Sequence, residues 1–334
     1  MSNEIMPAGS QSDFQPPPTI FDPATCVRKG LCPVTQIRTK GDPLESHSLY
    51  FELHGSGPEK VVFIMGLNSS SAAWLPQVEH FARQPDYSVL VFDNRGVGNS
   101  DAPKGPYTTS GMAEDVITLL DYVGWKEPRQ VHVVGVSLGG MIAQELALKI
   151  PERIASLTLV VTKPGGRRYF ELPPYIGLKG IARTMFISEP AKKVPIVLDM
   201  LYPKEWLDSK SETDPQGRTN REVETEAYLR RIKFTRPQTF FGAISQMAAA
   251  LTHYVPPDQL RKISSSIPKV TIVTGDTDNL VDPSNSHLLK QHMPEAELIV
   301  RGGAGHGITV QYRTWFNELL ERVFKEGREK AGQH

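Results

Sequence analysis

The sequence predicts an α/β protein built on a doubly wound, mostly parallel eight-stranded sheet that is interrupted by a helical insertion. Short apolar runs alternate with helix-like segments across residues 34–163 and again across 265–326. Such alternation is typical of parallel sheets covered by helices on both faces. Between these two parts, residues 164–264 carry helical patterns but no strand pattern. Because this interval is too long for a structureless loop, it predicts a helical insertion.

Eight apolar or alternating runs are expected to form the strands of the sheet. The first two are expected to lie antiparallel at one edge, as mixed sheets allow. The others are separated by helix-like segments and are therefore expected to be parallel. In chain order the expected strands are 34–40, 48–54, 60–65, 88–92, 131–136, 156–161, 269–274 and 297–300.

Helices are expected between the later strands and throughout the insertion. Residues 110–123 show the clearest case, because Met112, Val116 and Leu119 fall on one helical face. The polar stretch 203–220 is expected to be a loop. The other expected helices are 73–83, the segment after residue 137, and 311–324 in the core, and 173–186, 194–201, 221–232 and 238–251 in the insertion.

The two ends of the chain are polar. Residues 1–33 are rich in proline and lack the apolar stretch of a signal peptide, so they are expected to form a disordered leader. Residues 327–334 are expected to form a frayed tail. No apolar run approaches the length of a membrane-spanning helix. Together these features predict a cytoplasmic protein.

The overall composition excludes several classes of partner. The formal net charge of the 334 residues is zero, so there is no electrostatic reason to expect a nucleic acid or an acidic membrane as a partner. The two cysteines, Cys26 and Cys32, are too few for a disulfide framework and lack the pattern of a zinc site. We therefore expect free thiols, no metal, no cofactor and a small molecule as the partner. The sequence does not indicate an oligomeric state.

The strongest functional motif is Gly-x-Ser-x-Gly, with Ser137 at its centre. An apolar strand, 131–136, precedes the serine and a helical pattern follows it. At such a strand-to-helix turn a serine has a strained backbone, and its hydroxyl is exposed above the carboxyl edge of the sheet. Gly135 and Gly139 leave room for the turn. Ser137 is therefore the candidate nucleophile, against the alternative of an ordinary structural turn.

Two other glycine-rich interpretations fail. Gly135 and Gly140 have the spacing of a phosphate-binding loop, but Met141 stands where that loop requires lysine. Gly96 and Gly98 begin a dinucleotide-binding fingerprint that lacks its third glycine. Neither segment therefore predicts a nucleotide cofactor.

A serine nucleophile requires a histidine base, and His306 is the best candidate among nine histidines. It lies between Gly305 and Gly307, directly after the last expected strand, where it can reach a site at the sheet edge. The alternative is a loop histidine that caps the next helix. The other histidines that we considered fit poorly: His132 lies inside a strand, His253 precedes the candidate acids, and His287 and His292 lie on a solvated helix.

Three aspartates after the strand 269–274 compete for the role of the acid that orients the histidine. They are Asp276, Asp278 and Asp282. With the serine and histidine above, the chain resembles the serine hydrolases of the α/β-hydrolase fold. In that family the acid usually falls three residues after the glycine that ends this strand, which implies Asp278. Asp276 then resembles a turn residue, and Asp282 before a proline resembles a helix cap.

The resemblance extends to the loop after the strand 60–65. The family commonly has His-Gly there, whereas this chain has Met65 and Gly66. Because the oxyanion hole uses backbone N–H groups, the resemblance implies that the amides of Leu67 and Leu138 form it. The segment from Asp93 to Ser100 and the Pro-Glu-Arg-Ile at 151–154 also match the family. Candidate substrate contacts are Met65, Gly66, Asn68, Trp74 and Met141, with Trp74 facing either the site or the core.

The resemblance also implies that the insertion is a helical cap over the site, which excludes water and sets substrate shape. The expected function is a serine hydrolase that cleaves an ester, lactone or related acyl bond of a small, partly apolar compound. The alternatives left open are a small-molecule receptor with little turnover, a carbon–carbon bond hydrolase and a perhydrolase on the same site. Ser137 argues against the epoxide hydrolases and dehalogenases of this fold, which use an aspartate nucleophile.

Overall fold

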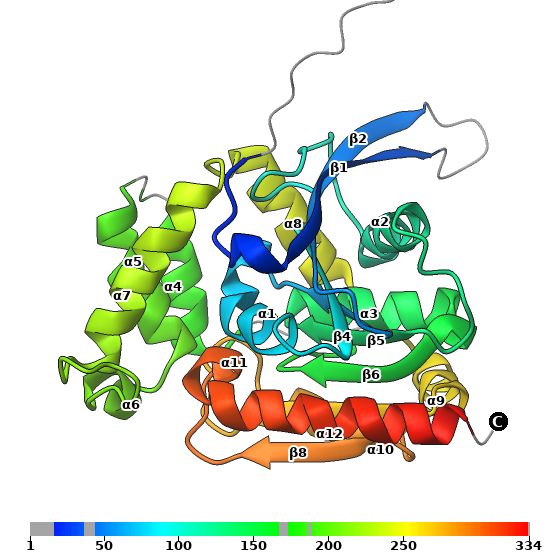
Figure 1. Cartoon of the computed structure of the whole chain (residues 1–334). Helices are drawn as coiled ribbons and strands as arrows, with labels where there is room; N and C mark the ends of the chain where they lie inside the picture. The colour runs from blue at the N-terminus through cyan, green and yellow to red at the C-terminus, as the bar shows by residue number, and fades with distance from the viewer. Residues whose placement is uncertain (1–16, 37–43, 167–172, 186, 188, 333–334) are drawn as a thin grey trace, which may run out of the picture.

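A single mixed sheet forms the centre of the protein. The computed structural model describes residues 17–36, 44–166, 173–185, 187 and 189–332. The sheet has eight strands in the order β1-β2-β4-β3-β5-β6-β7-β8 (Figure 1). β1 pairs antiparallel with β2 and β2 antiparallel with β4, and every later pair is parallel. The fold class predicted from the sequence is confirmed.

The strand bounds agree with the predicted ones to within a few residues, except at the first strand. Seven of the eight runs were placed correctly because their side chains are buried on one or both faces of the sheet. The strands are β1 (Cys26–Gln36), β2 (Glu45–His54), β3 (Glu59–Ile64), β4 (Tyr87–Phe92), β5 (Val131–Val136), β6 (Ile154–Val160), β7 (Lys269–Gly275) and β8 (Glu297–Arg301).

Two hydrophobic layers cover the two faces of this sheet. In β3, Val62 and Ile64 face one layer and Val61 and Phe63 face the other, as the two-residue period of a strand requires. The first layer contains α2 (Thr109–Tyr122), α3 (Leu138–Lys149), α9 (Pro257–Ser266) and the buried side of α10 (Ser284–His292). The second contains α1 (Leu75–Phe81), α11 (Ile308–Gln311) and α12 (Arg313–Ala331).

The predicted disordered leader is wrong for residues 17–33. β1 begins at Cys26, not at residue 34, and pairs with β2 along its whole length. Its sequence gives a weak strand signal, because Gly30 and Pro33 interrupt it. Proline is tolerated there because β1 is an edge strand, and burial of Cys32 and Val34 anchors the strand to the core. Residues 1–16 and 37–40 lie outside the described residues.

The predicted frayed tail is also wrong as far as residue 332. α12 continues to Ala331. Gly327 is buried against Ala155 and Ser156 of β6, where a Cβ atom would lie 2.7 Å from the Ser156 side chain. Arg328 donates hydrogen bonds to Glu59 at the start of β3. A polar helix end is ordered here because its partners are supplied by strands distant in sequence.

The insertion consists of two parts. Four helices form a separate body, whose core includes Leu198, Tyr202 and Leu207 (Figure 1). These helices are α4 (Tyr175–Met185), α5 (Pro190–Leu201), α6 (Lys204–Asp208) and α7 (Asn220–Arg231). α8 (Phe240–Thr252) instead lies against the main core, where Ala249 is buried. The four predicted helices are present, and the short α6 lies within the stretch expected to be a loop.

The predicted end of the insertion requires a correction. The insertion was predicted to extend to residue 264. However, Leu260 and Ile263 of α9 (Pro257–Ser266) are buried in the core layer together with α3 and α10. The chain leaves and re-enters the core at one point, because the Val255 N–H donates to the Pro164 carbonyl (2.9 Å). The insertion therefore ends at about residue 255.

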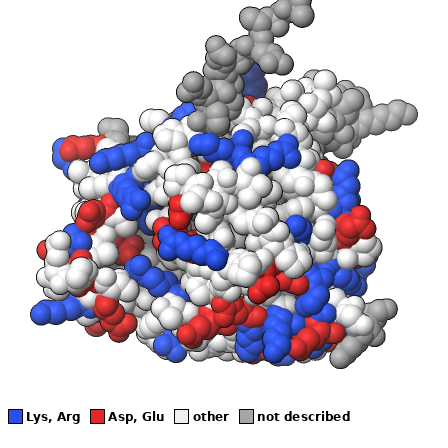
Figure 2. Space-filling model, in the orientation of Figure 1, with Lys and Arg blue, Asp and Glu red and all other residues white. Residues whose placement is uncertain are grey.

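The surface carries both signs of charge. In Figure 2, lysine and arginine alternate with aspartate and glutamate over the visible face, in keeping with the zero formal net charge. Elsewhere charges pair in a network in which Arg322 and the buried Lys269 both contact Glu297 and Glu326. Among the described helices, none has both the length and the apolar character needed to cross a bilayer.

Candidate active site

Ser137 lies on a sharp turn between β5 and α3. Its backbone has φ 56° and ψ −120°, a region that a residue other than glycine adopts only under strain. Both flanking positions must be glycine, because a side chain at either one would clash with the backbone. A Cβ atom on Gly139 would lie 2.1 Å from the Ile64 carbonyl oxygen, and one on Gly135 would lie 2.3 Å from that of Gly139. The motif therefore forms the strand-to-helix turn that its sequence predicts.

The end of β6 braces this turn. The Ser137 N–H donates to the Val160 carbonyl (2.9 Å), and the Thr162 hydroxyl donates to the Ser137 carbonyl (2.7 Å). Between them, Val161 has φ 43°, which is rare for a β-branched residue. The strand thus kinks so that Thr162 reaches the backbone of Ser137. Nothing in the spacing of the sequence indicates this contact.

Asp278 and His306 are in direct contact at the carboxyl edge of the sheet. His306 Nδ1 lies 2.8 Å from Asp278 Oδ2, and both side chains are buried. The other carboxylate oxygen, Oδ1, accepts the backbone N–H groups of Leu280 (2.7 Å) and Val281 (2.9 Å). Asp278 is therefore held from both sides. When Nδ1 donates to the carboxylate, Nε2 of a neutral His306 is the ring nitrogen that can accept a proton.

The two competing aspartates have structural partners instead. Asp276 Oδ1 accepts the N–H of Gly303 (2.7 Å), which joins the loops after β7 and β8. Asp282 Oδ1 accepts the N–H of Ser284 (2.9 Å) at the start of α10. These are the turn and cap roles expected for them.

The competing histidines that the structure buries also have structural partners. His132 contacts Ser156 through Nδ1 and Glu59 through Nε2, each at 2.8 Å. His253 contacts the Thr109 hydroxyl through Nδ1 (2.9 Å). Burial lowers the pKa of both imidazoles, to about 3 for His253. His132 is therefore a core histidine, as the sequence predicts.

The loop that carries His306 is held by a glutamine and by the insertion. Gln311 accepts the N–H of Gly305 (2.9 Å) and donates to the carbonyl of Gly303 (2.8 Å). The N–H of Gly307 donates to the Leu201 carbonyl at the end of α5 (2.9 Å). The position of the histidine thus depends on α11 on one side and on α5 on the other.

The loop after β3 passes directly beside Ser137. A Cβ atom on Gly66 would lie 3.1 Å from the Ser137 Cβ and 3.7 Å from its Oγ. Leu67 follows this glycine, and Leu138 is the first residue of α3. The two residues expected to supply the oxyanion hole therefore come from the loop after β3 and from the first turn of α3. Met65, the departure from the family pattern, is buried.

The remaining candidate substrate contacts occupy different environments. Asn68 has φ 55° and its N–H donates to Gln246 Oε1 of α8 (2.9 Å). Met141 is buried on the first turn of α3. Trp74 is fully buried and packs on Phe63, with ring centroids 4.7 Å apart. The sequence left open whether Trp74 faces the site or the core, and in the structure it lies in the core.

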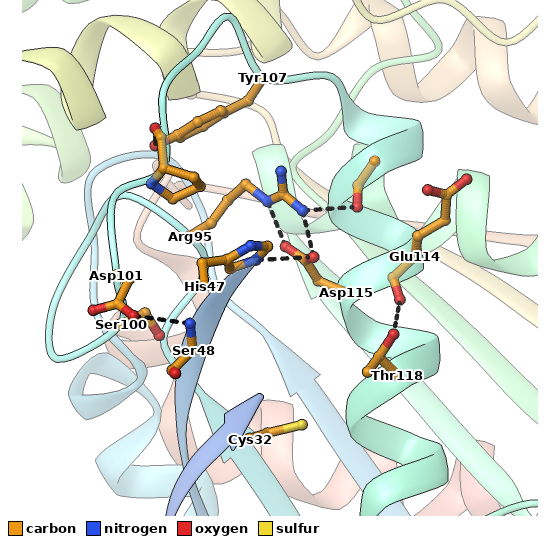
Figure 3. A network of polar contacts seen from close by, with 12 residues as sticks. Cys32, His47, Ser48, Arg95, Ser100, Asp101, Tyr107, Glu114, Asp115 and Thr118 are labelled. Carbon is orange, nitrogen blue, oxygen red and sulfur yellow. Dashed lines mark hydrogen bonds and ion pairs between the residues drawn. The ribbon is translucent and has the colours of Figure 1, made fainter. Parts of the chain in front are cut away.

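The loop after β4 is fixed by buried charges. Asp93 accepts hydrogen bonds from the backbone N–H groups of Ser71 (2.7 Å) and Asn99 (2.8 Å). Burial raises the pKa of Asp93, and these hydrogen bonds partly offset the rise. Arg95 forms a bidentate pair with Asp115 of α2, shown in Figure 3. These groups support the loop that follows β4.

Gln246 connects this support to the insertion, and no sequence pattern predicts its role. Its side chain is fully buried, accepts the Asn68 N–H and donates to the Arg95 carbonyl (2.7 Å). Gln246, Gln311 and Thr162 thus hold the three loops around Ser137. Each acts across a long sequence separation, so no local pattern could have identified it.

This turn, acid–histidine pair and sheet are those of an α/β hydrolase. The model of the alpha/beta hydrolase fold family matches residues 60–310, and the chain belongs to that family. It is 28% identical over 276 residues to a protein of Azorhizobium caulinodans named "Putative carbamate hydrolase RutD", covering 81% of this chain and 93% of that protein. A protein of the same name from Caulobacter vibrioides is 28% identical over 278 residues, with the same coverage.

Solved structures confirm the fold. The enol-lactonase from Burkholderia xenovorans LB400 has a TM-score of 0.65 and 21% identity, over 84% of this chain and 97% of its own. A thermophilic esterase from Thermogutta terrifontis has a TM-score of 0.66 and 18% identity, over 88% of this chain and 98% of its own. The chain is a hydrolase by family, and the chemistry of its substrate is a separate question.

Proposed function

We propose that this protein is a serine hydrolase that cleaves an ester, lactone or related acyl bond, such as a carbamate, in a small and partly apolar compound. One observation carries the proposal. The strained turn places Ser137 at the same sheet edge as the 2.8 Å contact between His306 and Asp278. A serine, a histidine and a carboxylate in this chain order are the elements of nucleophilic acyl transfer on this fold.

In the proposed reaction, Ser137 Oγ attacks the carbonyl carbon while His306 Nε2 takes the hydroxyl proton. The tetrahedral intermediate collapses, the bond to the leaving group breaks, and His306 returns the proton to that group. Water then attacks the acyl-enzyme, with His306 again as the base, and releases the acid and free Ser137. Asp278 stabilises the imidazolium and fixes its orientation through the Nδ1 contact.

The developing oxyanion is proposed to bind to the backbone N–H groups of Leu67 and Leu138. Support comes from Gly66, which brings the loop before Leu67 to within contact distance of Ser137. Leu138 is the first residue of a 12-residue helix, whose amino end favours negative charge. Met65, Gly66, Asn68 and Met141 remain proposed substrate contacts on the same grounds.

The apolar part of the substrate is proposed to contact the insertion. α4 and α8 flank the site loops: Gly177 packs against Asn279, next to Asp278, and Gly242 packs against Gly96. Both helices present exposed apolar side chains, namely Tyr175, Ile176 and Leu178 on α4 and Phe240, Phe241 and Ile244 on α8. Such surfaces suit an apolar acyl or alcohol group better than a charged one.

The experiment is labelling by a fluorophosphonate probe combined with steady-state turnover. We expect the label on Ser137 and multiple turnovers of p-nitrophenyl acetate, and we expect rates to vary across esters, lactones and aryl carbamates of graded chain length. Ser137→Ala is the control and should neither label nor turn over. A single turnover with persistently bound product would identify a receptor instead of an enzyme, and labelling at another residue would contradict the assignment.

A further inference from the structure

A cysteine, a glutamate and a histidine meet on one face of the β1–β2 pair, at the edge of the sheet. Their ligand atoms, Sγ of Cys26, a carboxylate oxygen of Glu52 and a ring nitrogen of His54, all lie within 4.8 Å of one another. Glu52 and His54 are buried and Cys26 is partly exposed. The proposed hydrolysis uses none of these groups.

A strand irregularity creates this cluster. From Arg28 onward the register pairs Arg28 with Leu53 and Lys29 with Glu52, so an unbroken ladder would place Val27 opposite His54. A register shift between Cys26 and Arg28 instead makes Cys26 the partner of His54. Partners in an antiparallel pair share a face, so the shift turns the thiol toward the histidine. Val27 is left pointing to solvent.

The surrounding hydrogen bonds orient the histidine for a metal. The Thr25 hydroxyl donates to the Asp22 carbonyl (2.9 Å), so it can only accept from His54 Nδ1, which lies 2.9 Å away. Nδ1 then carries the proton, and Nε2 presents a lone pair to the cluster. A ligating histidine typically has such a partner on its other nitrogen. The Tyr50 hydroxyl likewise orients the carboxylate by donating to Glu52 Oε1 (2.9 Å).

The two inward atoms face each other without a hydrogen bond. His54 Nε2 and Glu52 Oε2 lie 3.3 Å apart, and neither has a hydrogen-bond partner among the described residues. With Zn–N and Zn–O bonds of about 2.0–2.1 Å, a tetrahedral zinc holds such ligands about 3.3 Å apart. Lys29, the register partner of Glu52, directs its ammonium to the Pro17 carbonyl (2.9 Å). This spacing therefore suits a shared cation.

We propose that Cys26, Glu52 and His54 bind a divalent cation of the zinc type, with water as the fourth ligand. A thiolate, a carboxylate and a neutral imidazole together neutralise a 2+ ion and form a mixed sulfur, oxygen and nitrogen ligand set that zinc accepts. Because zinc takes the thiolate, binding releases the thiol proton to solvent as the S–Zn bond forms.

The site stabilises the sheet edge and takes no part in the proposed hydrolysis. His54 pairs with Val89, near the amino end of β4, whereas Ser137 follows the carboxyl end of β5. β4 and β3 separate β2 from β5. A bound ion ties the start of β1 to β2, which raises the stability of the folded state. Turnover of an ester substrate should be the same with and without the metal.

Cobalt(II) and zinc(II) titrations of the full-length, chelator-treated protein test the proposal. We expect one cobalt per chain, with the sulfur-to-cobalt charge-transfer band and the intense visible bands of tetrahedral cobalt, displaced by zinc. Cys26→Ser should abolish the sulfur band and weaken zinc binding on the order of 100-fold, and Thr25→Val should weaken it roughly 10-fold. Cys32→Ser is the matched control on the same strand and should bind as the parent does.

Zinc should also raise the midpoint of thermal unfolding of the parent by several degrees but not that of Cys26→Ser. If the folded parent bound neither cobalt nor zinc, the proposal would be overturned, because His54 and Glu52 would then form only an ion pair. A cobalt spectrum without a sulfur band, or one unchanged by Cys26→Ser, would also overturn it. The parent's spectrum suffices for this decision even if a variant fails to fold.

Discussion

Ser137, the proposed nucleophile, has a strained backbone conformation. Its backbone conformation is held by the Val160 carbonyl on one side and by the Thr162 hydroxyl on the other. The hydroxyl itself contributes nothing to these contacts. Removing it should therefore affect the reaction and leave the turn in place.

Ser137→Ala should lower kcat for p-nitrophenyl acetate by a factor on the order of 10⁴–10⁶, because the covalent route is lost while binding groups remain. The free energy of unfolding should stay within about 1 kcal/mol of the parent, since no hydrogen bond of the backbone changes. Steady-state assays measure kcat, and urea unfolding measures the free energy of unfolding. Esterase activity close to that of the parent would show that another residue is the nucleophile.

The neighbouring aspartates offer a second test at this scale. Asp278→Asn should lower kcat on the order of 10⁴-fold, because the amide can stabilise neither the imidazolium nor the correct ring tautomer. Asp276→Asn should cost less than roughly tenfold, since an amide oxygen can still accept the Gly303 N–H. Full pH–rate profiles of both variants make the comparison. Equal losses, or the reverse order, would mean that the acid is misassigned.

Elements whose side chains face the core were predictable, and elements held by distant partners were not. The central strands and the turn at Ser137 are encoded by local runs such as 131–136. The first part of β1 was missed because Gly30 and Pro33 weaken its pattern, and a local pattern does not show its pairing with β2. α9 was not predicted as a helix, and its residues were placed in the insertion, because no local pattern states which body a segment packs against.

The same distinction applies to the site. Ser137 and His306 were predicted from glycine-flanked positions at strand ends, and Asp278 from resemblance. Gln246 and Gln311 were not, because a buried amide gives no periodic signal. The cluster at Cys26 was missed for a related reason: its two partners come from the facing strand, in a register set by an irregularity.

The carboxyl end of α12 provides an element-scale prediction. Burial would raise the pKa of Glu59, but hydrogen bonds from His132 and Arg328 and the positive charge of Arg328 outweigh it and lower the pKa to about 2. Glu59 therefore contributes stability that is fully present above its ordinary pKa of 4.5 and is lost as the pH falls toward 2. Burial lowers the pKa of His132, so stability also falls as the pH drops below about 6.5.

Arg328→Ala should lower the free energy of unfolding by about 1–2 kcal/mol at pH 7, since Glu59 loses a partly exposed charged partner. It should also flatten the dependence on pH between 4.5 and 2, because the pKa of Glu59 then lies closer to its ordinary value. Urea unfolding at a series of pH values measures both. Lys325→Ala, an exposed position on the same helix, is the control, and an equal effect there would mean that α12 does not depend on Glu59.

At the scale of the whole molecule, the chain of the insertion leaves and re-enters the core at one place, but its helices contact several loops of the site. Its two ends meet where Gly165 bridges to Tyr254 and the Val255 N–H reaches the Pro164 carbonyl. Yet α4 packs on the loop after Asp278, α5 on the loop of His306, and α8 on the loop after β3. If the insertion binds substrate as proposed, this arrangement couples substrate binding to the position of the proposed catalytic groups.

Replacing residues 166–253 with a short Gly/Ser turn tests this coupling, since the two ends already lie side by side. All eight strands and α9 remain, so Ser137 should still react with a small fluorophosphonate. The contacts of Asp278 with Leu280, Val281 and His306 lie outside the deleted segment. Discrimination between short and long acyl esters should disappear, because the apolar surfaces of α4 and α8 are gone.

The deletion should also slow labelling, because the His306 loop loses the Leu201 carbonyl and Asn68 loses Gln246. Exposure of core side chains that Ala249 now covers will reduce solubility, so the variant is compared with its own Ser137→Ala form at equal concentration. The ratio of kcat/KM between acetate and octanoate esters is the deciding measurement. If a folded deletion variant kept the parent's ratio, specificity would reside in the core loops around Gly66, and the insertion would act only as support for them.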